Sequence, residues 1–503
     1  MKFLSLTPIL FSVIPIYFLY VHNIHLTSSD QIIFSLLIMI IFSISLLFGI
    51  NLIFKNLGKS AILVTIYVIL FFTYGHIYNI VDDVTIWDHD IGKHRYLLMC
   101  YGIIFGVSTY YITKKVSNPQ NLLKIFMGVG LASILMISVN YVEYNTNLET
   151  FDSTINNELN FETTNSKSNT IFPDIYWIVL DEYSDKKQLN NYFNYDNNEF
   201  VSFLEKEEFF IPEKTFSNYA MTFLLLGSTL NFEYVNYLTE KVGEENTDRH
   251  HTYEMIHHNK VMNYLNTKKY VTVNLDSGWE VTRNIKSANL NLCGNNEFLD
   301  SEFTPLFLKS TMLQPMVSKL ITSNNFERQM CVFDELSNVH MRIEQPVFVF
   351  AHILMPHAPY FFNSNGEYND SANEQKYTLE EEKALYVEQV KFVNDQMKHF
   401  IKNVKNNSEL QPIIIIQSDT GSNVGIDWEN ISEEQIFDRI DIINYYYIPY
   451  DIPEVISDEI SPVNSFRIIL KNIFEEEIEY LEDRYFFSTY EKPYKFSEIK
   501  IQP

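Results

Sequence analysis

The chain has 503 residues, of which 46% are hydrophobic, and a formal net charge of −26 at pH 7. A chain this acidic repels nucleic acid and gains nothing from an anionic lipid surface, so neither is expected as a partner. A negatively charged substrate would need a local positive feature such as a metal ion. The apolar residues are concentrated before residue 142, and the remainder has the composition of a soluble protein.

Five apolar segments near the N-terminus have the length and purity of membrane-spanning helices. They cover residues 3–20, 32–54, 61–80, 96–112 and 122–142. The first segment begins with Met1-Lys2, like a signal peptide. It has no small-residue cleavage site, however, and further spans follow it directly, so we expect it to be retained. We predict a transmembrane helical anchor at residues 1–142.

Basic residues are distributed unevenly among the loops between these segments. They precede the first segment, separate the second from the third and separate the fourth from the fifth: Lys2, Lys55, Lys59, Lys114, Lys115 and Lys124. The loop at 22–30 has none, and the loop at 81–95 is acidic apart from Lys93 and Arg95. Because cytoplasmic loops carry the excess of Lys and Arg, we predict a multi-pass protein of the cytoplasmic membrane, with its N-terminus inside and its C-terminal domain outside.

The second part of the chain has the pattern of an α/β domain. We predict a polar linker at 143–172, which is rich in Asn, Thr, Ser and Glu. Within 173–503, four apolar runs of strand length lie at 175–180, 270–275, 347–354 and 412–417. Such runs are typical of parallel strands that are covered on both faces. Thr378 and Glu381 form a capping box that begins a helix between the last two runs. The alternation predicts an extracytoplasmic α/β sandwich with a mainly parallel central sheet.

The three cysteines do not have the spacing of a zinc site. Cys100 lies inside a predicted membrane span, whereas Cys293 and Cys331 lie in the predicted external domain. An oxidising compartment would allow these two to form a disulfide. Two unpaired buried thiols are an equally good interpretation of the sequence.

Acidic and imidazole side chains follow three of the predicted strands. The first strand runs into Asp181-Glu182, the third contains His352 and leads to His357, and the fourth runs into Asp419. The carboxyl ends of parallel strands meet at one edge of a sheet, where carboxylates repel each other unless a cation lies among them. Asp and His are suitable ligands for a divalent metal. A single Asp after a strand, however, is more often a turn former or a helix cap.

Several motifs resemble the landmarks of a known family. They read PDIYWIVLDEY, SNYAMTFLLLGSTLNFEYV, FVFAHILMPHAPYFF and PIIIIQSDTGS, and the later segments INYYYIP and SPVNSFRIIL agree with them. In this order they resemble the membrane-anchored, sulfatase-like proteins of the alkaline phosphatase superfamily, which include lipoteichoic acid synthases and phosphoethanolamine transferases. The likeness covers residues 173–503, and a helical anchor with an external catalytic domain is also that family's layout.

The resemblance implies a divalent metal ion, Mn, Mg or Zn, and a set of residues that hold it. These are an acidic residue after the first strand, a Thr nucleophile at a helix start and an Asp-His pair after a later strand. By position they become Asp181, Thr222, Asp419 and Thr420. The resemblance also implies that His357 faces the substrate, as a donor to a phosphoryl oxygen or to a leaving group. Taken alone, Thr222 reads as an ordinary helical or capping threonine and His352 as a buried, hydrogen-bonded strand residue.

The chain departs from the family pattern at Thr420, where the family has His. A neutral hydroxyl is a poor replacement for imidazole on a transition metal. Three outcomes are open: another group such as Glu182, Asp185 or His357 fills the position, metal binding is weak, or catalysis is lost. The absence of a Cys/Ser-x-Pro-x-Arg segment disfavours sulfate-ester cleavage.

The resemblance implies a metal-dependent enzyme that transfers or hydrolyses phosphoryl or phosphodiester groups of lipid-linked or bacterial cell-envelope polymers. The expected substrates are a phospholipid or a cell-surface glycan, and a tether beside the membrane raises the effective concentration of a lipid donor. The alternative is a catalytically impaired module of the same fold, with a binding or scaffolding role in surface polysaccharide assembly. A transporter built from the helices alone is disfavoured, because the spans carry almost no interior charge.

Overall fold

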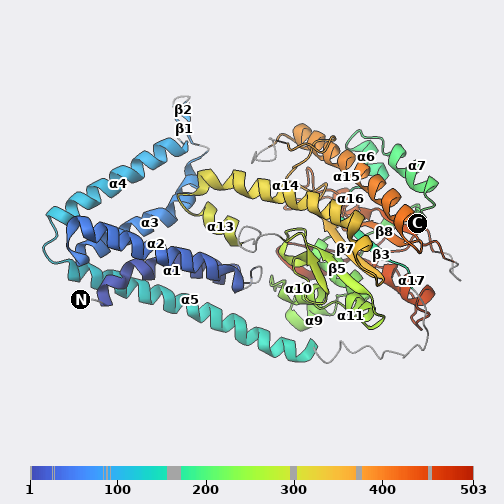
Figure 1. The fold of residues 1–503 in the computed structure, drawn as a ribbon, viewed down its shortest axis with the longest axis horizontal. Helices are drawn as coiled ribbons and strands as arrows, with labels where there is room; N and C mark the ends of the chain where they lie inside the picture. Colours follow the sequence, from blue (N-terminus) through green and yellow to red (C-terminus); the bar gives the residue numbers. More distant parts are fainter. Residues whose placement is uncertain are drawn as a thin grey trace. The chain divides into compact units, whose positions relative to one another are not determined.

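A computed structural model describes residues 3–24, 27, 29–82, 84–86, 89–90, 92–155, 172–294, 303–369, 377–450 and 456–501. The chain divides into two compact units (Figure 1). The first unit is Met1–Glu158 together with Asn296–Ile321, and the second is Leu159–Asn295 together with Thr322–Pro503.

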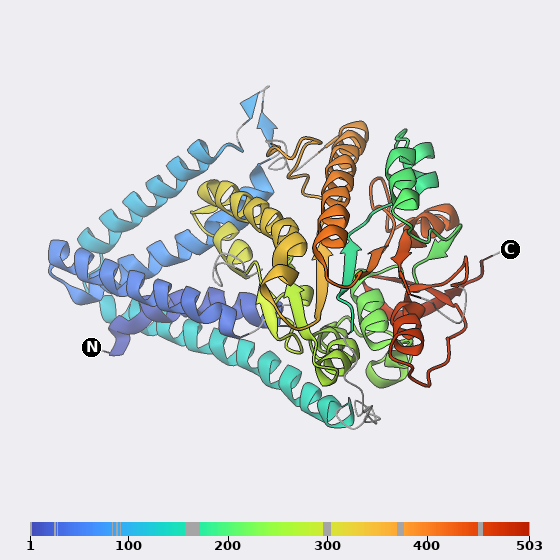
Figure 2. The same ribbon diagram turned by 45° about the vertical axis from the view of Figure 1, so that its right-hand side comes forward.

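The first unit is helical. Its elements are η1 (Phe3–Leu6), α1 (Thr7–His22), α2 (Asp30–Phe54), α3 (Leu57–Val81), β1 (Thr85–Ile86), β2 (His89–Asp90), α4 (His94–Lys114), α5 (Pro119–Ile155) and α13 (Phe303–Lys309). Helix α1 packs against α2, α3 and α5, and α3 packs against α4; Figures 1 and 2 show these helices in blue to cyan. Five segments are long and apolar enough to cross a membrane: Phe3–His22, Gln31–Phe54, Leu57–Val81, His94–Lys114 and Pro119–Thr146. The five predicted apolar helices are confirmed.

Many large apolar side chains lie on the outside of this unit, and a few hydroxyl groups are buried within its apolar core. The side chains of Phe48 and Met136 are 66% and 73% exposed, and many other large apolar residues are exposed with them. In contrast, Ser12 and Ser43 are fully buried, and their hydroxyls bond to each other between α1 and α2. This distribution suits a hydrocarbon solvent, in which outward apolar groups cost nothing and interior hydroxyls associate neighbouring helices.

One segment from the middle of the chain belongs to this helical unit. Phe303 and Phe307 of α13 are buried in its apolar core, and the ring of Phe307 lies 6.0 Å from that of Phe72. Helix α14 (Gln314–Asn338) then passes from the first unit into the second. In the structure α5 continues to Ile155, and the described residues from Phe303 to Ile321 group with the helices. Helix α13 has only seven residues, and nothing in its sequence shows whether it packs in the core of the helical unit or in that of the α/β unit.

The second unit is an α/β domain. Its strands are β3 (Ile175–Leu180), β4 (Thr215–Phe216), β5 (Val271–Leu275), β6 (Leu290–Leu292), β7 (Val347–Ile353), β8 (Ile413–Ser418), β9 (Asp441–Ile442), β10 (Asn444–Tyr447), β11 (Tyr485–Thr489) and β12 (Lys492–Ile499). Its helices, besides the second part of α14, are α6 (Lys186–Asn191), α7 (Asn198–Lys206), α8 (Thr222–Asn231), α9 (Leu238–Val242), α10 (His250–His257), α11 (Lys260–Thr267), α15 (Leu379–Asn407), α16 (Glu433–Ile440) and α17 (Ser465–Asn472), with the short helices η2 (Glu280–Thr282), η3 (Val339–Arg342) and η5 (Pro462–Asn464).

Six strands form the central sheet, in the order β10-β8-β3-β7-β5-β6. Strand β3 pairs in parallel with both β7 and β8, and β5 pairs in parallel with β6 and β7. Only β10 runs antiparallel, along β8 at the edge. All six residues of β3 are buried, as its unbroken apolar run predicts for a central strand. The predicted mainly parallel α/β sandwich is confirmed.

Side chains of β3 alternate between two helical layers. Tyr176, Ile178 and Leu180 belong to a core cluster with residues of α7, α14 and α15. Trp177 points the other way and meets the ring of Phe466 of α17 at 5.2 Å. Figure 1 shows α15 and α17 on opposite sides of the strands. Helix α15 begins at the predicted capping box. The layers leave the carboxyl ends of β3, β7 and β8 together at one edge of the sheet.

A disulfide joins Cys293, which follows β6, to Cys331 of α14, with the Cα atoms 5.7 Å apart. Of the two interpretations of the sequence, the structure therefore has the bonded pair. Cys100 is free.

We expect a variant with both Cys293→Ser and Cys331→Ser to lose about 2–4 kcal/mol of unfolding free energy, because the bond closes a long loop in the unfolded chain. The measurement is thermal unfolding of the full chain in detergent, with and without a reducing agent. Reduction should lower the wild-type midpoint to that of the double variant. Cys100→Ser is the control and should leave the midpoint unchanged; equal midpoints for all three proteins would contradict a stabilising bond.

Candidate metal centre and active site

The parallel order brings three strand ends to the middle of the sheet. Leu180 at the end of β3 pairs with Ser418 at the end of β8. The next residues of these two strands are Asp181 and Asp419, and His352 is the penultimate residue of β7. Two carboxylates and one imidazole therefore arrive at the same edge.

Asp181, His352 and Asp419 form a candidate metal centre. One ligand atom from each residue lies within 4.8 Å of the others, and all three residues are buried. Burial, followed by the neighbouring Asp419 carboxylate, raises the pKa of Asp181 well above its usual range. Crowded carboxylates behave in this way when no cation lies among them. Two carboxylates and an imidazole are a donor set that fits a divalent metal.

The imidazole of His352 is oriented for a ligand. Its Nδ1 lies 3.2 Å from the hydroxyl of Thr282, whereas its Nε2 is buried without a hydrogen-bond partner among the residues that the structure describes. Burial lowers the pKa of His352 to about 4, so the ring is neutral at physiological pH. A neutral ring with one nitrogen hydrogen-bonded and the other free is the usual state of a metal-binding histidine.

Thr222 is the first residue of α8, and its hydroxyl donates to Asp419 Oδ2 at 2.5 Å. The other oxygen, Oδ1, accepts from the backbone N–H groups of Glu182 at 2.9 Å and Thr420 at 2.7 Å. The positive end of a helix dipole at Thr222 stabilises negative charge on its oxygen. The structure thus brings Asp181, Thr222 and Asp419 to one place.

Of the remaining residues singled out in the sequence, Asp185 and Glu182 bind other groups, whereas the Thr420 hydroxyl binds none in the described part of the chain. Thr420 is fully buried, and its Oγ1 has no hydrogen-bond partner in the described part of the chain. Asp185 caps α6, where its carboxylate accepts from two backbone N–H groups at 2.7 and 2.8 Å. The carboxylate of Glu182 is held by Arg439.

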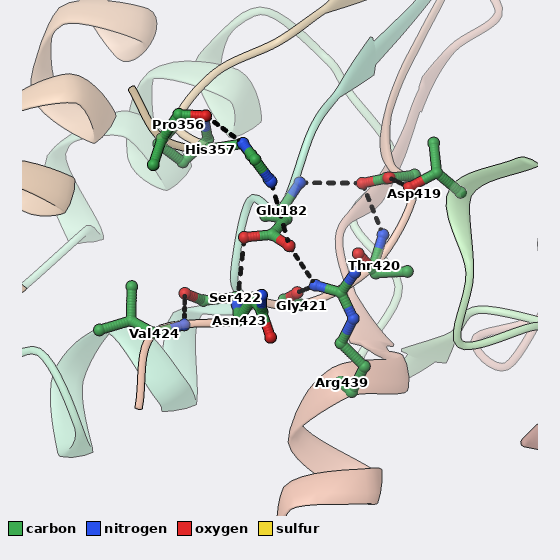
Figure 3. A network of polar contacts seen from close by, with 12 residues as sticks. Glu182, Pro356, His357, Asp419, Thr420, Gly421, Ser422, Asn423, Val424 and Arg439 are labelled. Atoms are coloured by element: carbon green, nitrogen blue, oxygen red, sulfur yellow. Dashed lines mark hydrogen bonds and ion pairs between the residues drawn. The ribbon is translucent and has the colours of Figure 1, made fainter. Parts of the chain in front are cut away.

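Glu182 and Arg439 form a buried ion pair. Their side chains are 6% and 1% exposed, and Arg439 Nη1 lies 2.7 Å from Glu182 Oε1. The same Nη1 donates to the carbonyl oxygen of Gly421 at 2.5 Å, and Nε donates to that of Ala220 at 3.4 Å. Figure 3 shows Arg439 reaching both Glu182 and Gly421. Gly421 and Ala220 are each two residues from a site residue, so Arg439 joins the three segments that carry the site.

The backbone of Glu182 lies in the left-handed region, with φ 60°, a conformation that is costly for a residue with a Cβ. Several contacts hold it there, among them the backbone N–H of Asn423, which donates to Glu182 Oε2 at 3.2 Å. The N–H of Glu182 donates to Asp419, its carbonyl oxygen accepts from the hydroxyl of Tyr386 at 2.7 Å, and its carboxylate pairs with Arg439. Strained residues that are fixed by many neighbours are typical of active sites.

His357 lies at the open side of the cluster. Its side chain is 42% exposed, and its Nε2 is 3.8 Å from Glu182 Oε1, toward which it points in Figure 3. Gln389 of α15 fixes the loop by donating to two of its carbonyl oxygens at 3.2 Å each. Burial lowers the pKa of His357, but the carboxylates of Glu182 and Asp181 outweigh this effect and raise the pKa to about 9. His357 is therefore a proton donor at neutral pH.

Sequence reasoning missed Arg439, Tyr386 and Gln389. All three lie on amphipathic helices, whose pattern predicts core packing and gives no sign of contact with the site. His352 did have a signal, an imidazole at a strand end between two strands that end in carboxylates.

No protein-family model matches the chain, and no curated protein sequence matches it. Among solved structures, it is similar to the integral membrane lipooligosaccharide phosphoethanolamine transferase A from Neisseria meningitidis, at 13% identity over 88% of this chain and 87% of that chain, with a TM-score of 0.37. It is also similar to the zinc complex of the C-terminal periplasmic domain of the Escherichia coli protein EptC, at 12% identity over 59% and 81% of the two chains, with a TM-score of 0.37. A sulfatase of glycosaminoglycan metabolism from Bacteroides thetaiotaomicron matches at 11% identity over 65% and 83%, with a TM-score of 0.40. The chain is similar, at low sequence identity, to phosphoethanolamine transferases and sulfatases.

Proposed function

We propose that the protein is a metal-dependent transferase or hydrolase of phosphoryl or phosphodiester groups in lipid-linked or cell-envelope substrates. The observation that carries this proposal is the Thr222 hydroxyl at a helix N-terminus, hydrogen-bonded to a carboxylate of the candidate metal centre. A hydroxyl in this setting ionises readily and attacks phosphorus.

Asp181, Asp419 and Thr222 would hold a divalent ion, Mn, Mg or Zn. When bound, the ion would supply positive charge for the phosphoryl oxygens and favour the alkoxide. Thr222 Oγ1 passes its proton to Asp419 Oδ2 and bonds to phosphorus, and the leaving alcohol departs with a proton from His357. An acceptor hydroxyl or water then gives its proton to His357 and displaces the threonine oxygen from phosphorus, and Asp419 returns its proton to the departing threonine oxygen.

The proposed site of action is outside the cytoplasmic membrane. The distribution of Lys and Arg among the loops supports this orientation, and the Cys293–Cys331 disulfide suits an oxidising compartment. The helical anchor keeps the domain beside the lipid phase, where a phospholipid headgroup is at high effective concentration. A phospholipid donor and a cell-surface glycan or lipid acceptor are therefore the proposed substrates.

The test is turnover by the full chain in detergent micelles. We expect hydrolysis of bis-p-nitrophenyl phosphate that is lost after chelation and restored by at least one of Mn²⁺, Mg²⁺ and Zn²⁺. Asp419→Asn, with unchanged circular dichroism, should be inactive. Vesicles that contain phosphatidylethanolamine or phosphatidylglycerol then test which headgroup is released.

A second candidate function is a binding or scaffolding module without catalysis. The observation that favours it is Thr420, which stands where the family pattern has a histidine and whose hydroxyl makes no hydrogen bond among the described residues. A folded chain without turnover on either substrate would support this function against the enzyme.

A further inference from the structure

We propose that His352 is the imidazole ligand of the metal centre, in the role that the family pattern gives to the position of Thr420. The inference rests on the proposed function in assuming a divalent ion at this site. It concerns a separate point, namely which side chain replaces the missing histidine.

The position of Nε2 is the first reason. This nitrogen is buried and has no hydrogen-bond partner in the described residues, and one ring nitrogen of His352 lies within 4.8 Å of ligand atoms of both Asp181 and Asp419. A buried polar atom without a partner is costly. Oxygen and nitrogen ligands about 2.0–2.2 Å from one ion lie at most about 4.4 Å from each other. The limit of 4.8 Å on the separations in the cluster is close to this value, and an ion would satisfy the nitrogen and both carboxylates together.

The surroundings of the ring are the second reason. Nδ1 faces the hydroxyl of Thr282 at 3.2 Å, and this hydroxyl in turn lies 2.8 Å from that of Ser277. The ring of Trp279 lies 5.4 Å from the imidazole. A hydrogen bond from Nδ1–H to Thr282 leaves the lone pair on Nε2, the tautomer that a metal requires.

Sheet geometry explains how one histidine replaces the other. Strand β3 lies between β8 and β7, so a group after β8 and a group at the end of β7 both reach the end of β3. The family pattern takes its imidazole from the residue after Asp419. In this chain that residue is a threonine, and an imidazole is available from the strand on the other side of β3.

The experiment measures metal binding and does not depend on turnover. The full chain in detergent is stripped with a chelator and titrated with Mn²⁺ and Zn²⁺ by calorimetry. His352→Gln is expected to weaken binding more than about 100-fold, beyond the effect of losing an outer hydrogen bond. The matched control Thr420→Val removes the other candidate and should change affinity less than twofold. Moving the imidazole back, in His352→Gln with Thr420→His, should recover part of the lost affinity.

A second readout is spectroscopic and begins with the wild-type chain. Bound Mn²⁺ in the wild-type chain should show electron-spin-echo modulation from one imidazole nitrogen. The signal should persist in His357→Gln, which lies nearby, and disappear in His352→Gln. Equal affinity of His352→Gln and wild type, a loss in Thr420→Val as large as that in His352→Gln, or absence of the nitrogen signal would overturn the inference.

These outcomes separate the inference from the proposed function. A wild-type chain that binds one ion through His352 but turns over no phosphodiester supports the inference and refutes the enzyme. A chain that turns over substrate and binds metal equally well with Gln at position 352 supports the enzyme and refutes the inference. A wild-type chain that binds no ion refutes the inference whatever the turnover.

Discussion

Thr222→Ala is expected to lower phosphodiester turnover by roughly 10³-fold or more, the scale of loss seen when a catalytic nucleophile is removed. The reason is that the hydroxyl at the start of α8, bonded to Asp419, is the atom that attacks phosphorus in the proposed mechanism. No other hydroxyl in the described residues donates to this carboxylate. Turnover is measured with bis-p-nitrophenyl phosphate and the full chain in detergent.

Thr222→Ser is the matched control for this experiment. It keeps the hydroxyl and the helix start, so it should retain most of the turnover. Mass spectrometry of acid-quenched protein should find phosphate on residue 222 in the wild type and in Thr222→Ser, and none in Thr222→Ala. Turnover in the alanine variant close to that of the wild type would mean that water attacks phosphorus directly.

Arg439→Met should cost about 3–5 kcal/mol of unfolding free energy, because it removes the buried cation that lies 2.7 Å from the Glu182 carboxylate and leaves His357, at 3.8 Å, as the nearest charged group. It also removes donors from the carbonyl oxygens of Gly421 and Ala220. The measurement is thermal or chemical unfolding of the full chain, compared with the wild type under the same detergent conditions.

The double variant Glu182→Gln with Arg439→Met tests whether the buried Glu182 charge causes the loss of stability in Arg439→Met. Replacing the carboxylate by a neutral amide removes the buried charge that has lost its closest cation, so the double variant should be more stable than Arg439→Met alone. Additive losses from the two single variants would show instead that the ion pair contributes little and that packing decides the effect.

The sequence predicted those parts of the structure in which burial imposes a pattern on the chain. Spans and central strands are unbroken apolar runs, so the membrane helices, the parallel strands and the edge that gathers Asp181 and Asp419 followed from it. Thr222 was reached only through the family resemblance, since a threonine at a helix start has no signal of its own.

Contacts between segments that are distant in the sequence leave no comparable pattern in the sequence, so they were not predicted. Arg439 lies 257 residues from Glu182, and a single arginine on a short amphipathic helix predicts a solvated face as readily as a buried pair. The environment of His352 depends on Thr282, 70 residues earlier. Likewise, nothing in α13 indicates that it packs on the membrane helices, because its apolar residues suit either core.

The two carboxylate oxygens of Asp419 have different hydrogen-bond partners, and this constrains which ions the candidate metal centre accepts. Oδ1 is fixed by two backbone N–H groups, and Oδ2 holds the nucleophile. The carboxylate therefore cannot rotate to follow ions of different radius without releasing one of these partners. An ion whose binding displaced this carboxylate would also displace the Thr222 hydroxyl, so the choice of ion would change the reaction rate more steeply than the binding affinity. The centre would discriminate among metals kinetically, at the step of attack.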